Sequence, residues 1–227
     1  MKNKSFGDRY DKVYREGLQK SVWPWTSVVT ILHKLKKGLN PNAKILEIGC
    51  GMGANINLIQ SLEYEYFGID FSSFAINEIL NTHPELVEKL AVGDFTKNIS
   101  FFDKKFNIIL DRASLTCNPT SKIKNCIELI KKELITGGYF VGVDWYSTDH
   151  SGFKEGKSQE DEFSLIFDEK ESLFDPPRMH FSSKEHINNL FKEFEIIHLE
   201  HHITETSKSK LSKPDSIASW NFVAQLK

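Results

Sequence analysis

The sequence predicts an α/β fold, in which one domain forms a doubly wound parallel sheet. Three observations predict this class. Short apolar segments alternate with helical segments, the first apolar segment runs into a glycine-rich turn, and the others are followed closely by aspartate. Strands that alternate with helices form parallel sheets through right-handed crossovers. The chain has 227 residues, which is enough for one such domain.

The elements follow in order along the chain. Residues 1–40 predict a helical segment, in which apolar residues recur at helical spacing until Gly38, Asn40 and Pro41 end it. Strands are expected at 43–48, 66–69, 90–92, 106–110 and 139–143, and helices at 55–62, 73–80 and 123–134. A helix at 182–191 then begins at a capping box of Ser182 and Glu185, and two closing strands follow at 195–199 and 220–226.

Composition excludes several classes of protein. The chain carries 29 basic and 31 acidic residues, so its net charge of −2 indicates no nucleic-acid or membrane surface. Three cysteines without a CxxC pair predict neither a disulfide framework nor a structural zinc site. We expect a reduced, cytoplasmic setting, because no apolar run reaches the length of a membrane helix and the polar start does not resemble a signal peptide.

The strongest motif is the glycine-rich turn, ILEIGCGMGAN, at residues 45–55. Glycines allow the backbone to turn tightly and approach a ligand closely, and the helix that follows offers free N–H groups. The spacing also satisfies a loose dinucleotide-binding pattern through Gly49, Gly51 and Ala54. Glu47 precedes the turn, where a carboxylate would repel a pyrophosphate and would suit an ammonium group.

Acidic residues end the next two strands as well. Asp70 stands where a carboxylate accepts hydrogen bonds from a ribose diol. Asp94 can accept from an adenine amino group, and Phe95 can cover the face of the ring. Because the carboxyl ends of parallel strands line one crevice, these groups should converge on one ligand. That ligand should contain an amine, a ribose and an adenine, and no phosphate.

These residues resemble the class I S-adenosylmethionine-dependent methyltransferases over roughly residues 40–145. The segments that carry the resemblance are ILEIGCGMG, YFGIDFS, VGDF and FNIILDRAS. It implies a single Rossmann-like domain with a seven-stranded, mostly parallel sheet and an antiparallel last strand. It also implies S-adenosylmethionine as cofactor and the following cofactor-binding residues: Glu47, Gly49, Cys50, Gly51, Gly53, Asp70, Phe71, Asp94, Phe95, Asp111, Arg112 and Ala113.

More narrowly, the chain resembles the thiopurine/tellurite-type small-molecule methyltransferases. The residues concerned are YREG at 14–17, WPW at 23–25 and DRAS at 111–114. This resemblance implies that Tyr14 and Trp25 cover the cofactor, while packing within an N-terminal helix is the alternative. We divide the chain into an N-terminal cap at 1–40 and a methyltransferase domain at 41–227. Within that domain, residues 146–180 form an insert on the acceptor side.

No catalytic residue is assigned from the sequence, because a sulfonium is already activated and the enzyme mainly aligns the acceptor. Asp111 could accept a proton from the acceptor or orient it, or it could bind the cofactor or the backbone, which is the favoured alternative. Trp145 could wall the acceptor pocket or pack in the core. Either His150 or His180 could be a base, but both are expected at the surface, and Cys117 and Cys126 are expected as buried thiols. The insert, with nine acidic and four basic residues, could form a lid or a solvated loop, and it argues against a polyanionic acceptor.

The expected function is methyl transfer to O, N or S of a small-molecule acceptor. An NAD-dependent oxidoreductase is an alternative, although Glu47 and the Asp94–Phe95 pair count against it. A methyltransferase that acts on a macromolecule is another, although its [DN]PP[YFW] signature is absent after the fourth strand. A cofactor-binding protein without activity is the least favoured of the four.

Overall fold

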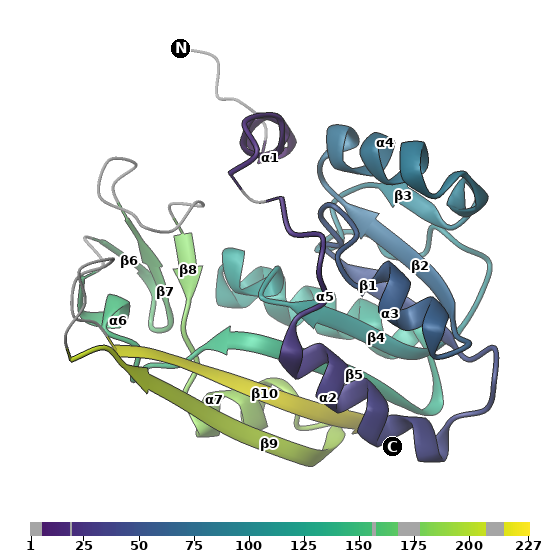
Figure 1. The fold of residues 1–227 in the computed structure, drawn as a ribbon. Coiled ribbons are helices and arrows are strands. Elements are labelled where there is room, and N and C mark those ends of the chain that lie inside the picture. The colour runs from purple at the N-terminus through teal and green to yellow at the C-terminus, as the bar shows by residue number, and fades with distance from the viewer. Residues whose placement is uncertain (1–5, 19, 156–157, 168–177, 208–215) are drawn as a thin grey trace.

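A seven-stranded sheet forms the centre of the molecule (Figure 1). The computed structural model describes residues 6–18, 20–155, 158–167, 178–207 and 216–227. In spatial order the strands are β3 (Leu90–Val92), β2 (Glu65–Asp70), β1 (Lys44–Ile48), β4 (Phe106–Arg112), β5 (Leu134–Tyr146), β10 (Ser216–Leu226) and β9 (Phe194–Glu205). Strands β1 to β5 pair in parallel, and β10 runs antiparallel to both β5 and β9. The predicted fold class, including its antiparallel last strand, is confirmed.

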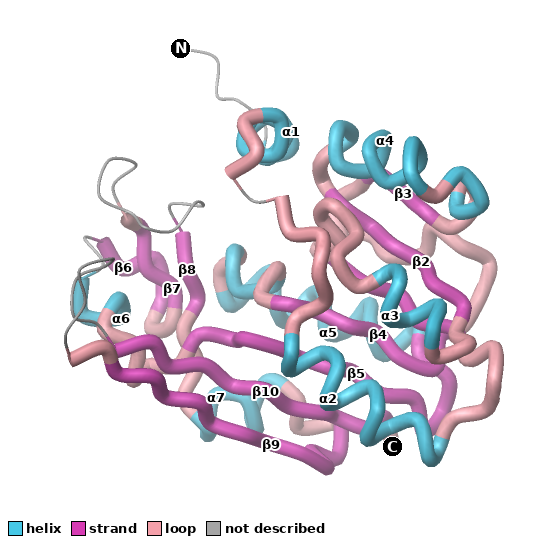
Figure 2. The backbone as a smooth tube through the Cα atoms, in the orientation of Figure 1, coloured by secondary structure: helices cyan, strands magenta, loops and turns pink. Residues whose placement is uncertain are grey.

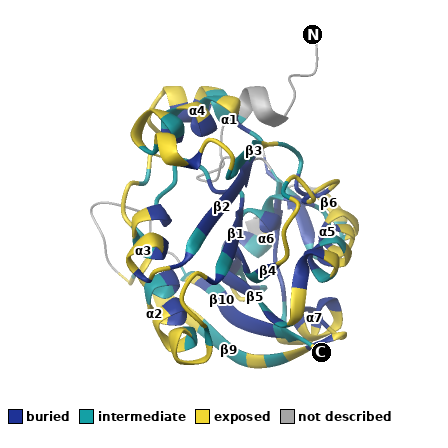
Figure 3. Ribbon diagram, turned by 90° about the vertical axis from the view of Figure 1, so that its right-hand side faces the viewer, coloured by how far each residue is buried: buried dark blue, intermediate teal, exposed yellow. Residues whose placement is uncertain are grey.

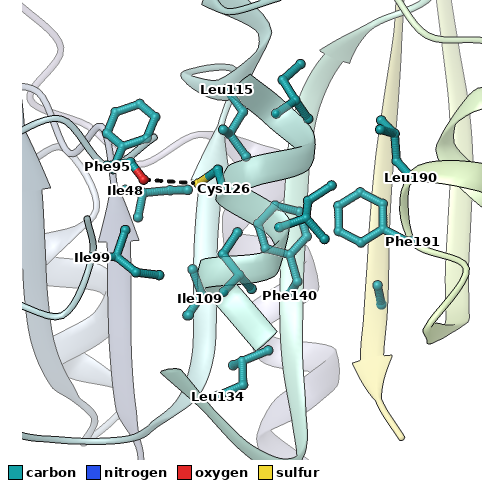
Figure 4. Close-up of a cluster of buried hydrophobic side chains, with 14 of the residues drawn as sticks. Ile48, Phe95, Ile99, Ile109, Leu115, Cys126, Leu134, Phe140, Leu190 and Phe191 are labelled. Atoms are coloured by element: carbon teal, nitrogen blue, oxygen red, sulfur yellow. Dashed lines mark hydrogen bonds between the residues drawn. The ribbon is translucent and has the colours of Figure 1, made fainter. Parts of the chain in front are cut away.

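Helices cover both faces of this sheet. One face packs against α2 (Thr26–Leu35), α3 (Ile56–Ser61) and α4 (Ser73–Thr82). The other packs against α5 (Thr120–Glu133) and α7 (Lys184–Leu190), where Figure 4 shows Phe140 between the helix α5 and Phe191. Because side chains alternate along a strand, Ile45 of β1 joins the first cluster while Leu46 and Ile48 join the second. The central strands are accordingly buried on both faces, whereas the helices expose their outer faces (Figure 3).

Short 3₁₀ turns complete the connections, at η1 (Lys36–Gly38), η2 (Pro84–Leu86) and η3 (Leu115–Cys117). None of the helices in the described ranges is both long and apolar enough to cross a membrane.

The N-terminal helix α1 (Phe6–Arg15) lies against α4 (Figures 1 and 3). Asp11 makes this contact, because its carboxylate accepts hydrogen bonds from Ser72 Oγ at 2.5 Å and from the Phe74 N–H at 3.2 Å. The guanidinium of Arg15 lies 4.4 Å from the centroid of the Phe74 ring. The helix ends at Arg15, and Gly17 then adopts a left-handed φ of 71°.

The 146–180 insert contains regular structure that the sequence did not predict. It forms α6 (Gly152–Glu155) and a small antiparallel sheet of β6 (Ser158–Asp161), β7 (Ser164–Ile166) and β8 (Arg178–His180), separate from the main sheet (Figure 2). Leu165, Phe167, Met179 and Phe181 form its own apolar core. Strands of three or four residues are too short for an alternating pattern to be recognised. Residues 156–157 and 168–177 of the insert lie outside the described ranges.

Helix α7 begins one residue later than predicted. Its N-cap is Ser183, whose hydroxyl accepts a hydrogen bond from the His186 N–H at 3.1 Å. The predicted capping box of Ser182 and Glu185 is therefore wrong. Ser182 instead extends the chain beside β5, where it forms an isolated bridge with Ser147. The two closing strands are also longer than predicted. β9 and β10 pair with each other along their whole length, from the pair Phe194 and Leu226 at one end to the pair Glu205 and Ser216 at the other.

Candidate active site

A cavity of about 560 Å³ opens at the carboxyl ends of β1, β2 and β4. Helix α1 and the segment that precedes α2 form its opposite wall. Ligands of open α/β sheets bind at this edge. Eleven of the sequence-predicted residues line the cavity: Tyr14, Trp25, Glu47, Gly49, Cys50, Gly51, Asp70, Phe71, Phe95, Arg112 and Ala113. Three others, Gly53, Asp94 and Asp111, do not.

Glycine is required in this turn for two reasons, the backbone conformation and the lack of space for a side chain. Gly49, Gly51 and Gly53 all have positive φ, at 69°, 52° and 79°. A Cβ on Gly49 would overlap Ser114 Oγ, and one on Gly51 would lie 3.0 Å from the hydroxyl of Tyr14. Gly53 serves packing, because a Cβ there would meet the side chain of Ile56 in α3. Glycine therefore keeps the turn close to the cavity and to the helix that follows.

Glu47 is a buried carboxylate at the floor of the cavity. Its Oε1 accepts a hydrogen bond from Asn55 Nδ2 at 2.6 Å, and its Oε2 accepts from the Tyr66 hydroxyl at 2.8 Å. Burial raises the pKa of Glu47 to about 7, although the bonds from Asn55 and Tyr66 lower it. A cation beside this carboxylate would favour its ionised form, so the position suits an ammonium group.

Asp70 lies at the end of β2, next to the glycine turn. Its two oxygens accept hydrogen bonds from the Gly51 N–H and the Ser72 N–H, both at 2.8 Å. Burial raises the pKa of Asp70 to about 6, against the effect of these bonds. The rings of Phe71 and Phe95 lie beside it, edge to face, with centroids 5.3 Å apart. One wall of the cavity therefore combines a fixed carboxylate with an aromatic corner.

Asp94 directs its carboxylate into its own turn. It accepts from the N–H of Thr96 at 3.0 Å and from the hydroxyl of Thr96 at 2.5 Å, and it lies 3.1 Å from Lys97 Nζ. Of the predicted Asp94–Phe95 pair, the structure therefore brings only the aromatic ring to the cavity.

Asp111 is fully buried behind the cavity wall. It accepts from the N–H groups of Ser114 at 3.1 Å and Leu115 at 3.0 Å, and from the Trp145 indole at 2.7 Å. Burial raises the pKa of Asp111 to about 7. Of the two interpretations left open for each residue, the structure favours backbone binding for Asp111 and core packing for Trp145, which is fully buried against Phe140.

Arg112 and Trp25 join the sheet to the N-terminal segment. Arg112 donates from Nε to Asp144 Oδ2 at 3.0 Å, and its guanidinium carbon lies 3.6 Å from the centroid of the Trp25 ring. Ala113 and Asp144, which flank this contact at the ends of β4 and β5, both have a φ of 55°. Such left-handed residues cluster at functional sites, because the surrounding structure must hold them.

Several lining residues were missed by the sequence reasoning. Tyr10 lies one turn before Tyr14 on α1, so the helical spacing could have identified it. Tyr146 follows the buried Trp145, and strand alternation could have placed it on the cavity side. Cys117 is half-buried and lines the cavity, which corrects its expected burial. Met179 stands on the three-residue strand β8, and no pattern in the sequence points to it.

The two histidines that were expected at the surface are buried. His150 is 1% exposed, and its Nδ1 accepts from the Gly152 N–H at 2.9 Å. His180 is fully buried beside Ser164 Oγ, 3.0 Å from its Nδ1, and burial lowers its pKa to about 3. Neither lines the cavity. Within the described ranges, no three His, Cys, Asp or Glu residues are grouped to hold a metal ion.

Comparison with known proteins identifies a family. A family model described as a methyltransferase domain matches residues 39–208, which is well over half of the chain. A search of the curated proteins finds no match.

Many solved structures share the fold. A methyltransferase from Methanosarcina mazei, described as S-adenosylmethionine-dependent, has a TM-score of 0.69 and 20% identity, and the match covers 91% of this chain and 99% of that one. TehB from Haemophilus influenzae has a TM-score of 0.63 and 15% identity, over 96% of this chain and 67% of that one. Magnesium protoporphyrin IX methyltransferase from Synechocystis, with bound S-adenosylmethionine, has a TM-score of 0.54 and 16% identity, over 99% and 87%.

Proposed function

Because the chain belongs to the methyltransferase domain family, we propose that it transfers a methyl group from S-adenosylmethionine to a small-molecule acceptor. The observation that carries this proposal is the pairing of Glu47 and Asp70 in one cavity. These two carboxylates would repel a pyrophosphate, but they suit an ammonium and a ribose diol. This charge pattern supports S-adenosylmethionine over NAD.

Each part of the proposed cofactor has a group to receive it. Glu47, held by Asn55 and Tyr66, would accept hydrogen bonds from the amine of the methionine part. Asp70 would accept further hydrogen bonds from the ribose hydroxyls, because a carboxylate has about four lone-pair sites and the N–H groups of Gly51 and Ser72 take one on each oxygen. The corner of Phe71 and Phe95 would cover the adenine ring. For Asp94 to accept a hydrogen bond from the adenine amino group, its carboxylate would have to turn away from Thr96.

The proposed cofactor supplies an electrophilic methyl group on a sulfonium. The residues of the chain would then align the acceptor and exclude water, and alignment alone can lower a barrier by about 7–11 kcal/mol. Tyr10 and Tyr14 of α1 suit the second task, since they line the cavity opposite the sheet. Burial raises the pKa of both hydroxyls, so they stay protonated at neutral pH. Neither hydroxyl would therefore serve as a general base at neutral pH.

The proposed small-molecule acceptor is supported by the size and the walls of the cavity. The N-terminal segment contributes Tyr14, beside Gly51, and Trp25, over Arg112, to the wall opposite the sheet. The cavity volume of about 560 Å³ is also in the range of small-ligand sites. Among the acids of the insert whose side chains are described, none lines the cavity, so the charge of the insert does not decide the acceptor.

The test is to supply the protein with methyl-tritiated S-adenosylmethionine and a cell extract separated by size into metabolites and macromolecules. We expect the label to appear in the metabolite fraction. Label found only in protein or nucleic acid would refute the small-molecule acceptor while leaving the methyltransferase activity in place.

A further inference from the structure

Arg112 presents an unused edge of its guanidinium to the cavity. Only Nε has a hydrogen-bond partner, Asp144 Oδ2 at 3.0 Å, and no partner for either Nη group is found within the described ranges. The side chain is 31% exposed and lines the cavity. Arginine carries five N–H donors, so most of its capacity remains for a ligand.

Two contacts fix the plane of this guanidinium. The bond from Nε to Asp144 holds it from one edge, and the indole of Trp25, 3.6 Å from the guanidinium carbon, holds its face. The two Nη groups therefore form a pre-oriented fork on the opposite edge. Such a fork matches a carboxylate through two parallel hydrogen bonds, and fixing it beforehand lowers the entropy lost on binding.

The charges of the cavity are separated along the sheet. Glu47 lies in β1 and Asp70 ends β2, whereas Arg112 ends β4, on the side of β5. Asp144, which partly neutralises Arg112, does not line the cavity, and we infer from this that the Nη edge of Arg112 faces inward. Lys20 also lines the cavity, and no ion pair or hydrogen bond is found for it in the described part of the chain. The side of the cavity next to β4 thus carries the positive Arg112, while the side with the glycine turn carries two carboxylates.

We propose that the fork of Arg112 binds a carboxylate of the acceptor, so that the enzyme methylates small carboxylic acids at another atom. This inference rests on the proposed function, because it assumes that the cofactor occupies the end with Glu47 and Asp70. Lys20 adds a second cation to the lining of the cavity. Trp25 and Tyr146 supply the aromatic surface against which the body of such an acid would lie.

The test uses matched probes on the protein saturated with S-adenosylhomocysteine. The probes are 4-hydroxy-, 4-amino- and 4-mercaptobenzoate, each paired with its uncharged amide, and binding is measured by calorimetry. A charge-assisted bidentate contact should make the acids bind about tenfold more tightly than their amides, or better. In Arg112→Gln this preference should disappear, and in Arg112→Lys it should fall, because lysine keeps the charge but not the fork.

Arg178→Gln is the control, since Arg178 pairs with Glu160 outside the cavity, and it should keep the preference. Equal binding of acids and amides by the unaltered protein, or no binding of any acid at millimolar concentration, would overturn the proposal. So would a loss of S-adenosylhomocysteine affinity in Arg112→Gln that matches the loss of acid affinity, because the fork would then hold the cofactor's own carboxylate. If S-adenosylhomocysteine itself fails to bind the unaltered protein, the proposed function fails first.

Discussion

At the scale of single residues, the protonation of Glu47 should control binding of the cofactor. Because burial raises the pKa of Glu47 to about 7, half of the carboxylate is neutral at that pH. An ammonium group binds the ionised form, so affinity should fall as the pH decreases. We expect the dissociation constant for S-adenosylmethionine to rise about fivefold between pH 7 and pH 6, as measured by calorimetry.

Two variants separate Glu47 from other titrating groups. Glu47→Gln should bind more weakly at pH 8 and lose this pH dependence. Glu85→Gln should keep it, because Glu85 is exposed and does not line the cavity. An unchanged pH dependence in Glu47→Gln would show that another group, such as Asp70, binds the amine.

Substitution of Gly49 should affect both the stability of the protein and its binding of the cofactor. Alanine there would have to adopt a φ of 69° and would overlap Ser114 Oγ. The left-handed conformation alone costs about 1–2 kcal/mol. We expect Gly49→Ala to lose at least that much free energy of unfolding in urea, and to bind the cofactor at least tenfold more weakly.

The matched control is Gly38→Ala, because nothing lies within 4 Å of a Cβ built on Gly38. It should stay within about 0.5 kcal/mol of the unaltered protein. Equal stability and affinity of the two variants would mean that the turn has room for a side chain. That result would contradict the proposal that the backbone of the turn approaches the ligand closely.

At the scale of elements, Asp11 makes the hydrogen bonds that hold α1, one wall of the cavity, against α4. Asp11 accepts hydrogen bonds from Ser72 and Phe74, whereas α4 keeps its own N-cap bond from the Ala75 N–H to Ser72 Oγ. Asp11→Ala should therefore free α1 without melting α4. We expect faster tryptic cleavage after Arg15 and about tenfold weaker cofactor binding, with little change in Tm.

Lys12→Ala serves as the control, since the Lys12–Glu16 ion pair is exposed and contributes little. S-adenosylhomocysteine should slow the cleavage of the unaltered protein. Cleavage at the same rate in Asp11→Ala and the unaltered protein would mean that other contacts hold α1 in place.

The elements also show what sequence reasoning can reach. Strands β1 to β5 were predicted because each is an apolar run bounded by an acid or a glycine. The small sheet of the insert was missed because its strands span three or four residues. Asp94 was assigned to the ligand from its position after β3, but its carboxylate binds Thr96, a choice between local and ligand contacts that spacing does not reveal.

At the scale of the whole molecule, buried titratable groups make stability depend on pH in opposite directions. Burial raises the pKa of Glu47 and Asp111 to about 7, so their contribution to stability grows as the pH falls toward the unfolded pKa near 4. His180 acts in the other sense. Burial lowers its pKa to about 3, so stability is lost as the pH falls below the unfolded value near 6.5.

His180→Gln isolates this second contribution. The difference in free energy of unfolding between the unaltered protein and the variant should shrink by about 2 kcal/mol from pH 7.5 to pH 5, measured with urea. The neighbours that share the site, His186 and Asp161, remain in both proteins. A difference that stays constant over this range would mean that His180 has the same pKa in the folded and unfolded protein.

The arrangement of the whole molecule predicts the cofactor more firmly than the acceptor. The sheet order brings the ends of β2, β1 and β4 together, so residues far apart in sequence form one cavity, as the motifs indicated. The remaining walls of the cavity come from α1, the segment before α2 and β8, whose sequences carry no motif of comparable strength. The proposed acceptor site therefore depends on Arg112 of β4 and its contacts.

Calorimetric titration of the purified protein with S-adenosylmethionine, S-adenosylhomocysteine and NAD tests the central claim most directly. We expect micromolar binding of the first two and none of NAD, because Glu47 occupies the position that a pyrophosphate would approach. Binding of NAD alone would contradict the account, and it would mean that the glycine turn serves a dinucleotide.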